Sequence, residues 1–371
     1  MRVSEKLNTF SQKFLLLLSL LSRKRAYNYP FYVDLDITER CNLKCPGCPY
    51  HSPSADETKK TNQKDMDFET IVRIFNELKK KTRDIILLGS GEPMMHKRFV
   101  DIIKEGKSLG LNLTVLTNGT LIIEKTAREL VEAGLNRISI SLWDTDKEGY
   151  AKTYSVSDGA LFNRVVSGIK LIHDVKTEVG AQNPVTVIHF PVSKNNIHKI
   201  DKVRDLAVEC KVNELSFAPV FDMPGSNISL QLDTDQITLL SEKLREINND
   251  LSDAGIKFNL EGMLTRLKYG KAIWETMPCY VGLYHTKIKA DGRVQPCCRC
   301  NISLGNIHEQ SFEDIWKSEA YQSLRQNTLT KKNLKSFSPQ CACSYCSFVP
   351  KNYMVYKYDK YISPLAGLFN R

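Results

Sequence analysis

Short apolar runs alternate with longer amphipathic segments through most of this chain. The runs are rich in β-branched residues, and the segments repeat apolar positions at helical spacing. The predicted strands cover residues 31–37, 84–89, 111–119, 137–142, 184–190 and 214–220, and the predicted helices cover residues 68–81, 98–110, 124–134, 161–175 and 197–210. This rhythm predicts an α/β fold, a partial (β/α)6 barrel whose functional loops follow the carboxyl ends of the strands.

The pattern changes in the last hundred residues. A long helix is predicted from Thr234 to Ala254, and beyond residue 275 cysteines become frequent, with a turn at 290–293 and a short helix at 311–325. We therefore expect a small cysteine-rich α+β domain after the barrel. The predicted divisions are an N-terminal helix and linker at 1–28, a barrel at 29–275, a cysteine-rich domain at 276–350 and a tail at 351–371 without recognisable chemistry.

The run FLLLLSLL at residues 14–21 predicts an N-terminal helix. It is far shorter than the roughly 20 apolar residues that span a bilayer, and no cleavage site follows it. Its apolar side either docks on the protein's own body or dips into an anionic membrane surface, with the basic residues 23–25 at the headgroups. We expect a cytoplasmic protein, with peripheral contact at the inner membrane face as the alternative.

Composition narrows the possible functions. The 371 residues carry a formal net charge of +10 that is spread along the chain, which indicates a solvated basic surface and makes nucleic acid an unlikely partner. The eleven cysteines are an odd number and fall mostly in two groups. This pattern favours a reducing compartment and ligation of metals or clusters over disulfide bridges.

The first group is Cys41, Cys45 and Cys48, with three and two intervening residues, directly after the first predicted strand. Three thiolates can hold three irons of a four-iron cluster and leave the fourth iron open. This motif and its position resemble the radical S-adenosylmethionine (SAM) superfamily. The resemblance implies a [4Fe-4S] cluster whose open iron binds SAM, and reductive cleavage of SAM to a 5′-deoxyadenosyl radical.

Other residues extend this resemblance. Gly91, Glu92 and Pro93 match the GGEP-like motif that faces the SAM amino group, with Ser90 in place of a glycine. Asn118 and Ser141 follow the third and fourth strands, where relatives contact the SAM carboxylate and ribose; the alternative is a turn asparagine and a strand-end serine. Many members place an aromatic residue before the third cysteine, near adenine. Here that residue is Gly47, and Tyr50 is the candidate replacement.

The second group resembles the SPASM or twitch extension, which binds auxiliary four-iron clusters. Its seven cysteines are one fewer than two fully ligated clusters require. We expect one auxiliary cluster, with two clusters or a zinc site as alternatives. The predicted ligands are Cys279, Cys297, Cys343 and Cys346. The remaining cysteines, Cys298, Cys300 and Cys341, are expected to be buried, and Cys298 or Cys300 is a candidate hydrogen-atom donor.

The resemblance predicts a radical SAM oxidoreductase that dehydrogenates an alcohol carbon, with the auxiliary cluster as electron acceptor. Asp291 or Asp144 is the candidate general base, each with a structural alternative, and His189 is expected to face the pocket. Only 40 residues precede Cys41, which argues against a leader-peptide domain and favours a sugar-like or lipid-linked small-molecule substrate. The expected reductant is a flavodoxin or ferredoxin.

Three other outcomes stay open. The first is a radical epimerase that uses a cysteine hydrogen donor. The second is a maturase that modifies a peptide or protein side chain. The third is a non-enzymatic cluster-binding protein, which would not cleave SAM.

Overall fold

The computed structural model describes residues 3–45, 48–52, 62–79, 81–82, 84–154, 156, 159–222, 229–337, 341, 343 and 345–369. Its chain forms two compact units. The first unit comprises residues 1–35, 73–85 and 268–371, and the second comprises residues 36–72 and 86–267. The N-terminal helix thus belongs with the cysteine-rich C-terminal region.

The second unit is built on a parallel sheet. Its strands are β2 (Asp84–Leu88), which enters the unit at Ile86, β3 (Leu113–Thr117), β4 (Arg137–Ser141), β5 (Val185–Val192), β6 (Glu214–Pro219) and β7 (Lys257–Phe258). They lie in sequence order, and each pair from β3 to β7 is parallel. The carboxyl ends of these strands therefore lie on one rim, which confirms the predicted sheet and places the functional loops there.

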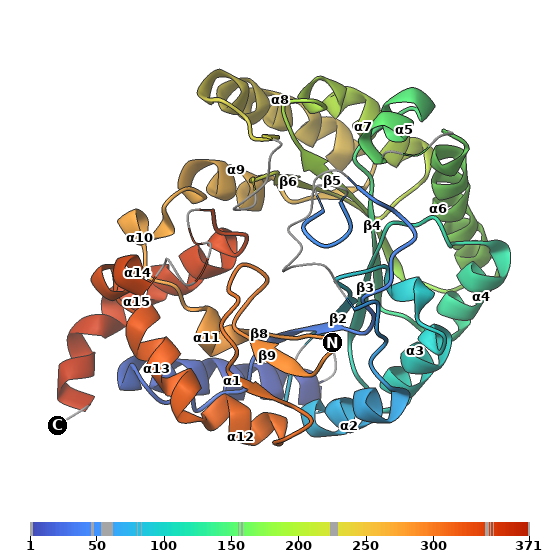
Figure 1. Cartoon of the computed structure of the whole chain (residues 1–371). Coiled ribbons are helices and arrows are strands. Elements are labelled where there is room, and N and C mark those ends of the chain that lie inside the picture. Colours follow the sequence, from blue (N-terminus) through green and yellow to red (C-terminus); the bar gives the residue numbers. More distant parts are fainter. Residues whose placement is uncertain are drawn as a thin grey trace. The chain divides into compact units, whose positions relative to one another are not determined.

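Helices cover the outer face of this sheet (Figure 1). They are α3 (Phe99–Ser108), α4 (Glu124–Glu132), α5 (Lys147–Tyr154), α6 (Ala160–Glu178), α7 (Ile200–Glu209), α8 (Thr234–Asp253) and α9 (Leu260–Tyr269), while α2 (Phe68–Leu78) crosses the boundary between the units. Gly110 ends α3 with φ of +76°, a conformation that glycine adopts without steric cost. Asp233 starts α8 in a reciprocal capping box with Gln236. The predicted helix ends are thus confirmed at these two points.

The first unit contains a smaller mixed sheet in the order β10-β9-β8-β1. Its strands are β1 (Tyr32–Asp36), β8 (His285–Ile288), β9 (Arg293–Gln295) and β10 (Gly305–Asn306). β1 is parallel to β8, and β8 to β10 form antiparallel pairs. The helices of this unit are α1 (Val3–Ser22), α10 (Ile273–Thr276), α11 (Val281–Tyr284), α12 (Phe312–Lys317), α13 (Glu319–Thr328), α14 (Lys331–Phe337) and α15 (Val349–Phe369).

Helix α1 docks its apolar side on the protein's own body. Leu20 is 2% exposed and lies in a core cluster with Tyr280 and Leu283 of the α11 region and Val355 of α15. Arg23, just after α1, forms an ion pair with Asp359 of α15 at 2.8 Å. These contacts favour the first of the two alternatives for residues 14–21. No helix within the described part of the chain is long and apolar enough to cross a membrane.

Two elements of the C-terminal region differ from the prediction. The single helix expected at 311–325 is two helices, because the chain breaks at Ser318, whose hydroxyl accepts the Tyr321 N–H at 3.3 Å and caps α13. The expected tail at 351–371 is largely the helix α15, whose apolar residues alternate with lysine and tyrosine without a strong helical pattern.

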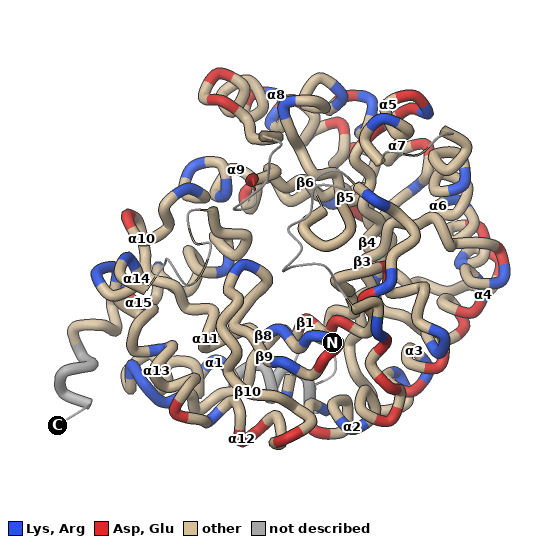
Figure 2. The backbone as a smooth tube through the Cα atoms, viewed as in Figure 1, with Lys and Arg blue, Asp and Glu red and all other residues tan. Residues whose placement is uncertain are grey.

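Charge is distributed as the composition predicts. Lys and Arg are interspersed with Asp and Glu along the helices of both units (Figure 2). Many of these charges form local ion pairs, such as Arg128 with Glu178 at 2.7 Å. Within each unit, basic and acidic side chains are therefore mixed along the chain.

Candidate functional site: two groups of cysteines

The loop after β1 carries the first cysteine group. Backbone N–H groups point at its sulfur atoms: Leu43 donates to Cys41 Sγ at 3.5 Å, and Tyr50 and His51 each donate to Cys48 Sγ at 3.4 Å. Such donors stabilise negative charge on sulfur, as a cluster ligand requires. Gly47 lies outside the described residues.

Burial affects the protonation of the thiols in this loop. Burial raises the pKa of Cys41 to about 11 and that of Cys45 to about 12, and negative charge on Cys48 opposes ionisation of both. In the metal-free loop Cys41 and Cys45 are therefore neutral thiols at neutral pH, and cluster binding must displace their protons. Among the described residues, no three His, Cys, Asp or Glu side chains converge as ligands of a single metal ion.

Arg40, next to Cys41, fixes the start of the loop. Its guanidinium binds the carboxylate of Asp65 through two hydrogen bonds, of 2.9 and 2.6 Å. Its carbonyl accepts the N–H of Glu92 at 2.7 Å. A Cβ on Gly91 would lie 2.1 Å from this carbonyl oxygen, so only glycine permits the approach. The Gly91-Glu92-Pro93 segment is thus packed against the cysteine loop.

Glu92 is buried and turns its carboxylate toward the end of β3. It accepts hydrogen bonds from the Thr117 hydroxyl at 2.7 Å, the Asn118 N–H at 2.7 Å and the Met94 N–H at 3.1 Å. Burial raises the pKa of this carboxyl group, although the three donors oppose the shift. Glu92 therefore links the motif to the third strand, while Pro93 starts a short 3₁₀ helix, Pro93–Met95.

Asn118 contacts the cysteine loop with its side chain. Its amide donates to Asn42 Oδ1 at 2.9 Å, and Asn42 in turn donates to the Thr120 hydroxyl at 2.8 Å. Asn42 follows Cys41, so this bond positions the first cysteine. The sequence did not single out Asn42, because an asparagine inside a cysteine loop carries no motif of its own.

Ser90 stands where the GGEP-like motif has a glycine, and its hydroxyl forms a hydrogen bond. It donates to Asp36 Oδ2 at 2.8 Å, and its carbonyl lies 2.8 Å from the His51 ring. Both bonds connect the motif to residues that flank the cysteine loop. The substitution therefore adds a hydrogen bond to the site.

Ser141 and His189 are neighbours on the predicted rim. They are paired residues of β4 and β5, and His189 is also paired with Ser216 of β6. Burial lowers the pKa of His189 to about 4, and the charge of Arg266 adds to this effect. The imidazole is consequently neutral at neutral pH, and it is a weak proton acceptor.

Both candidate aspartate bases have local partners. Asp144 is buried and forms an ion pair with Lys199, and it accepts the N–H of Thr145 at 2.7 Å. Asp291 binds the Arg293 guanidinium at 2.7 Å within the β8–β9 turn. These contacts account for both residues structurally, and a catalytic role for either stays a prediction.

Tyr150 of α5 lies near the candidate site, and the sequence patterns did not identify it as a site residue. Its ring stacks on Tyr154 with centroids 4.1 Å apart, and the Tyr154 hydroxyl donates to the Ser141 carbonyl at 2.9 Å. The Tyr150 hydroxyl is buried and has no hydrogen-bond partner among the described residues. Through Tyr154, the aromatic pair therefore contacts Ser141, the last residue of β4.

The second cysteine group gathers in the first unit. Cys297 belongs to one apolar cluster and Cys346 to another, while Cys279 and Cys343 pack against both. Burial raises the pKa of Cys279, Cys343 and Cys346 to about 12, and the pKa of Cys297 is also well above its ordinary value. Four neighbouring thiols, two buried and two partly buried, match the four-thiolate ligation of a closed cluster.

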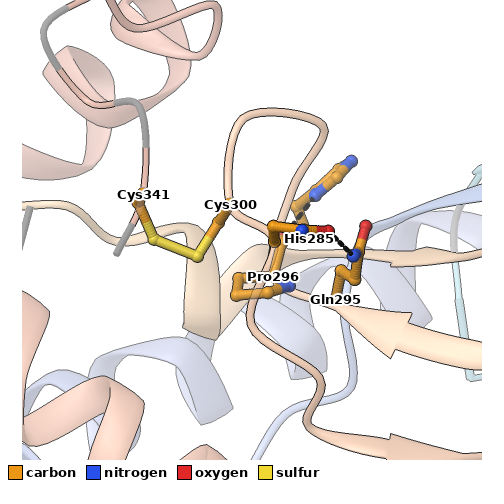
Figure 3. The surroundings of a disulfide bond; sticks show 6 residues. His285, Gln295, Pro296, Cys300 and Cys341 are labelled. Atoms are coloured by element: carbon orange, nitrogen blue, oxygen red, sulfur yellow. Dashed lines mark hydrogen bonds between the residues drawn. A yellow bond between two sulfur atoms is a disulfide. The ribbon is translucent and has the colours of Figure 1, made fainter. Parts of the chain in front are cut away.

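Two of the remaining cysteines are joined. Cys300 and Cys341 form a disulfide with an S–S distance of 2.03 Å. Figure 3 shows it together with His285, Gln295 and Pro296. This contradicts the expectation that the cysteines form no bridges. In this form Cys300 has no S–H to donate, so the hydrogen-donor hypothesis is wrong for Cys300. Cys298 is a free, exposed cysteine and remains the candidate.

Two family models match the chain. The radical SAM superfamily matches residues 35–207, and the SPASM iron–sulfur cluster-binding domain matches residues 279–347. The first match contains the three-cysteine loop, and the second begins and ends around the four-cysteine group.

Similar proteins span most of the chain. The cofactor-modifying protein of the tungsten-containing aldehyde ferredoxin oxidoreductase of Pyrococcus furiosus is 27% identical over 86% of this chain and 89% of its own. An AdoMet-dependent heme synthase of Methanosarcina barkeri is 26% identical over 80% and 85%. SuiB of Streptococcus suis, solved with bound SAM, has a TM-score of 0.66 at 20% identity and covers 86% of this chain and 72% of its own. SuiB has also been solved with its precursor peptide SuiA.

Proposed function

Because this chain belongs to the radical SAM superfamily and carries a C-terminal SPASM domain, we propose that it cleaves SAM to begin the radical modification of a peptide or protein side chain. One observation carries the proposal. The chain has one group of three cysteines, which can bind three irons of a cluster and leave the fourth open. It has a second group of seven, four of which are the proposed ligands of a fully ligated cluster.

The cofactors are SAM, the [4Fe-4S] cluster that binds it and an auxiliary cluster. When bound, the cluster that holds SAM would supply the electron that cleaves SAM to methionine and a 5′-deoxyadenosyl radical. This radical would remove a hydrogen atom from a substrate C–H. Cys41, Cys45 and Cys48 hold the first cluster in this proposal. Gly91 and Pro93 shape the SAM amino site, and Glu92 positions it through Thr117 and Asn118.

The remaining rim residues have proposed roles at SAM or at the substrate. Ser141 contacts the SAM ribose or carboxylate, and Tyr50 contacts adenine. The neutral His189 lies beside Ser141 in the sheet register and lines the substrate site. Asp144 and Asp291 are alternative bases, and each must leave its present cation to accept a proton.

The second group handles the electron in this proposal. Cys279, Cys297, Cys343 and Cys346 hold the auxiliary cluster. An auxiliary cluster held by these cysteines would accept the electron of a substrate that also gives up a hydrogen atom and, to a base, a proton, which is a two-electron oxidation of the substrate carbon. The cluster would pass this electron on to a flavodoxin or ferredoxin, which would also supply the electron that begins each cleavage of SAM.

The identity of the substrate is supported by the relatives. The two curated relatives named above are a cofactor-modifying protein and a heme synthase, and SuiB has been solved with a precursor peptide. The SuiB complex favours modification of a peptide over oxidation of a free sugar, which was the leading expectation from sequence.

The test uses extracts of cells grown in deuterated medium. The reconstituted protein is incubated anaerobically with SAM, a reductant and either the dialysed macromolecular fraction or the small-molecule fraction. The proposal predicts deuterium in 5′-deoxyadenosine with the macromolecular fraction, and loss of this signal after protease treatment of that fraction. Deuterium transfer from the small-molecule fraction alone would contradict it and support the sugar-like substrate.

A further inference from the structure

Asn352 lies at the start of α15, in a segment for which the sequence suggested no chemistry. Its side chain is fully buried. A buried amide must place both its oxygen and its nitrogen against partners, so each of its contacts is informative.

The orientation of this amide is fixed by its oxygen. Asn352 Oδ1 accepts the backbone N–H of Tyr280 at 2.9 Å and lies 3.2 Å from the Tyr284 hydroxyl, which donates to it. A backbone N–H can only donate, so the oxygen must face Tyr280. The NH₂ group therefore points the opposite way.

That NH₂ group faces the second cysteine group. Asn352 Nδ2 donates to Cys346 Sγ at 3.7 Å. Cys346 is one of the four proposed ligands of the auxiliary cluster. This contact therefore joins α15 to the proposed ligand set.

We propose that Asn352 is a positioning residue of the auxiliary cluster, whose amide donates a hydrogen bond to the thiolate of Cys346 and raises the reduction potential of the cluster. Donors to cluster sulfur stabilise the reduced form, which carries more negative charge. A higher potential makes the cluster a better acceptor for the electron of the substrate radical. The inference rests on the proposed ligand set.

The test uses the full-length chain with Cys41, Cys45 and Cys48 replaced by alanine, so that only the auxiliary cluster remains. The reduction potential of this cluster is measured by a redox titration followed by electron paramagnetic resonance, together with iron content. Asn352→Leu removes the donor without adding charge. Tyr284→Phe is the matched control, because it removes one bond to Oδ1 and leaves the NH₂ group in place.

The expected result is a shift of the Asn352→Leu cluster to lower potential with its iron retained, while Tyr284→Phe stays near the parent value. If Asn352→Leu fails to hold iron, Asn352→Ala, which is smaller and also removes the donor without adding charge, must show the same downward shift. An unchanged potential, equal shifts in Asn352→Leu and Tyr284→Phe, or loss of iron in both Asn352 variants would overturn the redox role. A parent protein without iron would instead refute the ligand set.

Discussion

The two cysteine groups differ in one donor to sulfur. In the three-cysteine loop, backbone N–H groups of Leu43, Tyr50 and His51 donate to the sulfur atoms. In the four-cysteine group, a side chain also donates: Asn352, from a helix after the last cysteine, binds Cys346 Sγ. The first group is therefore organised within one loop, whereas the second also uses an element that lies outside the segments of its cysteines.

The largest expected effect separates the groups by function. Replacing Cys41, Cys45 and Cys48 by alanine should abolish formation of 5′-deoxyadenosine, because no cluster remains to bind SAM. About four of roughly eight irons should be retained at the auxiliary site. Chromatography of the reaction and iron analysis measure both values. Undiminished 5′-deoxyadenosine would show that SAM is cleaved elsewhere.

The complementary change is Cys279→Ala with Cys346→Ala. It should remove about half of the iron and stop substrate oxidation, while SAM cleavage continues at the other group. The ratio of modified product to 5′-deoxyadenosine is the relevant measurement. A normal ratio after loss of this iron would exclude the auxiliary cluster as electron acceptor. Cys210→Ala is the control, because this buried cysteine lies outside both cysteine groups.

Glu92→Gln tests the link between the SAM motif and the third strand. The new NH₂ group replaces one of the two carboxylate oxygens, so it opposes either the Asn118 N–H or the Thr117 and Met94 donors. Loss of such a buried bond costs about 1–3 kcal/mol. We expect SAM affinity to fall about tenfold or more, since 1.4 kcal/mol corresponds to a factor of ten. Calorimetric titration of SAM measures this change. Thr117→Val removes a single donor and should have a smaller effect.

His189 should affect the pH dependence of stability. Its folded pKa of about 4 lies below the ordinary value of 6.5, so the unfolded chain binds a proton more readily between these values. Its contribution is fully present above pH 6.5 and is lost as the pH falls toward 4. In denaturant titrations, His189→Gln should flatten the dependence in this window. An equally steep dependence in the variant would assign the effect to other groups.

Asp291→Asn should have the smallest effect. Its ion pair with Arg293 is partly exposed, and such pairs contribute about 0–1 kcal/mol to stability. SAM cleavage and product formation should therefore be near normal. Product loss with intact SAM cleavage would instead identify Asp291 as the general base.

The sequence was sufficient where chemistry is local. Cysteine spacing and strand periodicity predicted the three-cysteine loop at the end of β1, and Gly91 was identified by its motif. Contacts between distant segments left no such pattern. Asn42 and Asn352 are asparagines whose contacts form only in the folded chain, where Asn118 after β3 donates to Asn42 and α15 brings Asn352 to Cys346 Sγ. The Cys300–Cys341 pairing depends on packing across 41 residues.

The central claim is that the three-cysteine group binds the cluster that cleaves SAM and that the four-cysteine group holds a separate closed cluster. The most direct measurement is iron content together with 5′-deoxyadenosine formation in the anaerobically reconstituted wild-type chain. We expect about eight irons per chain and 5′-deoxyadenosine under strong reductant. About four irons, or full iron content without 5′-deoxyadenosine, would contradict the account.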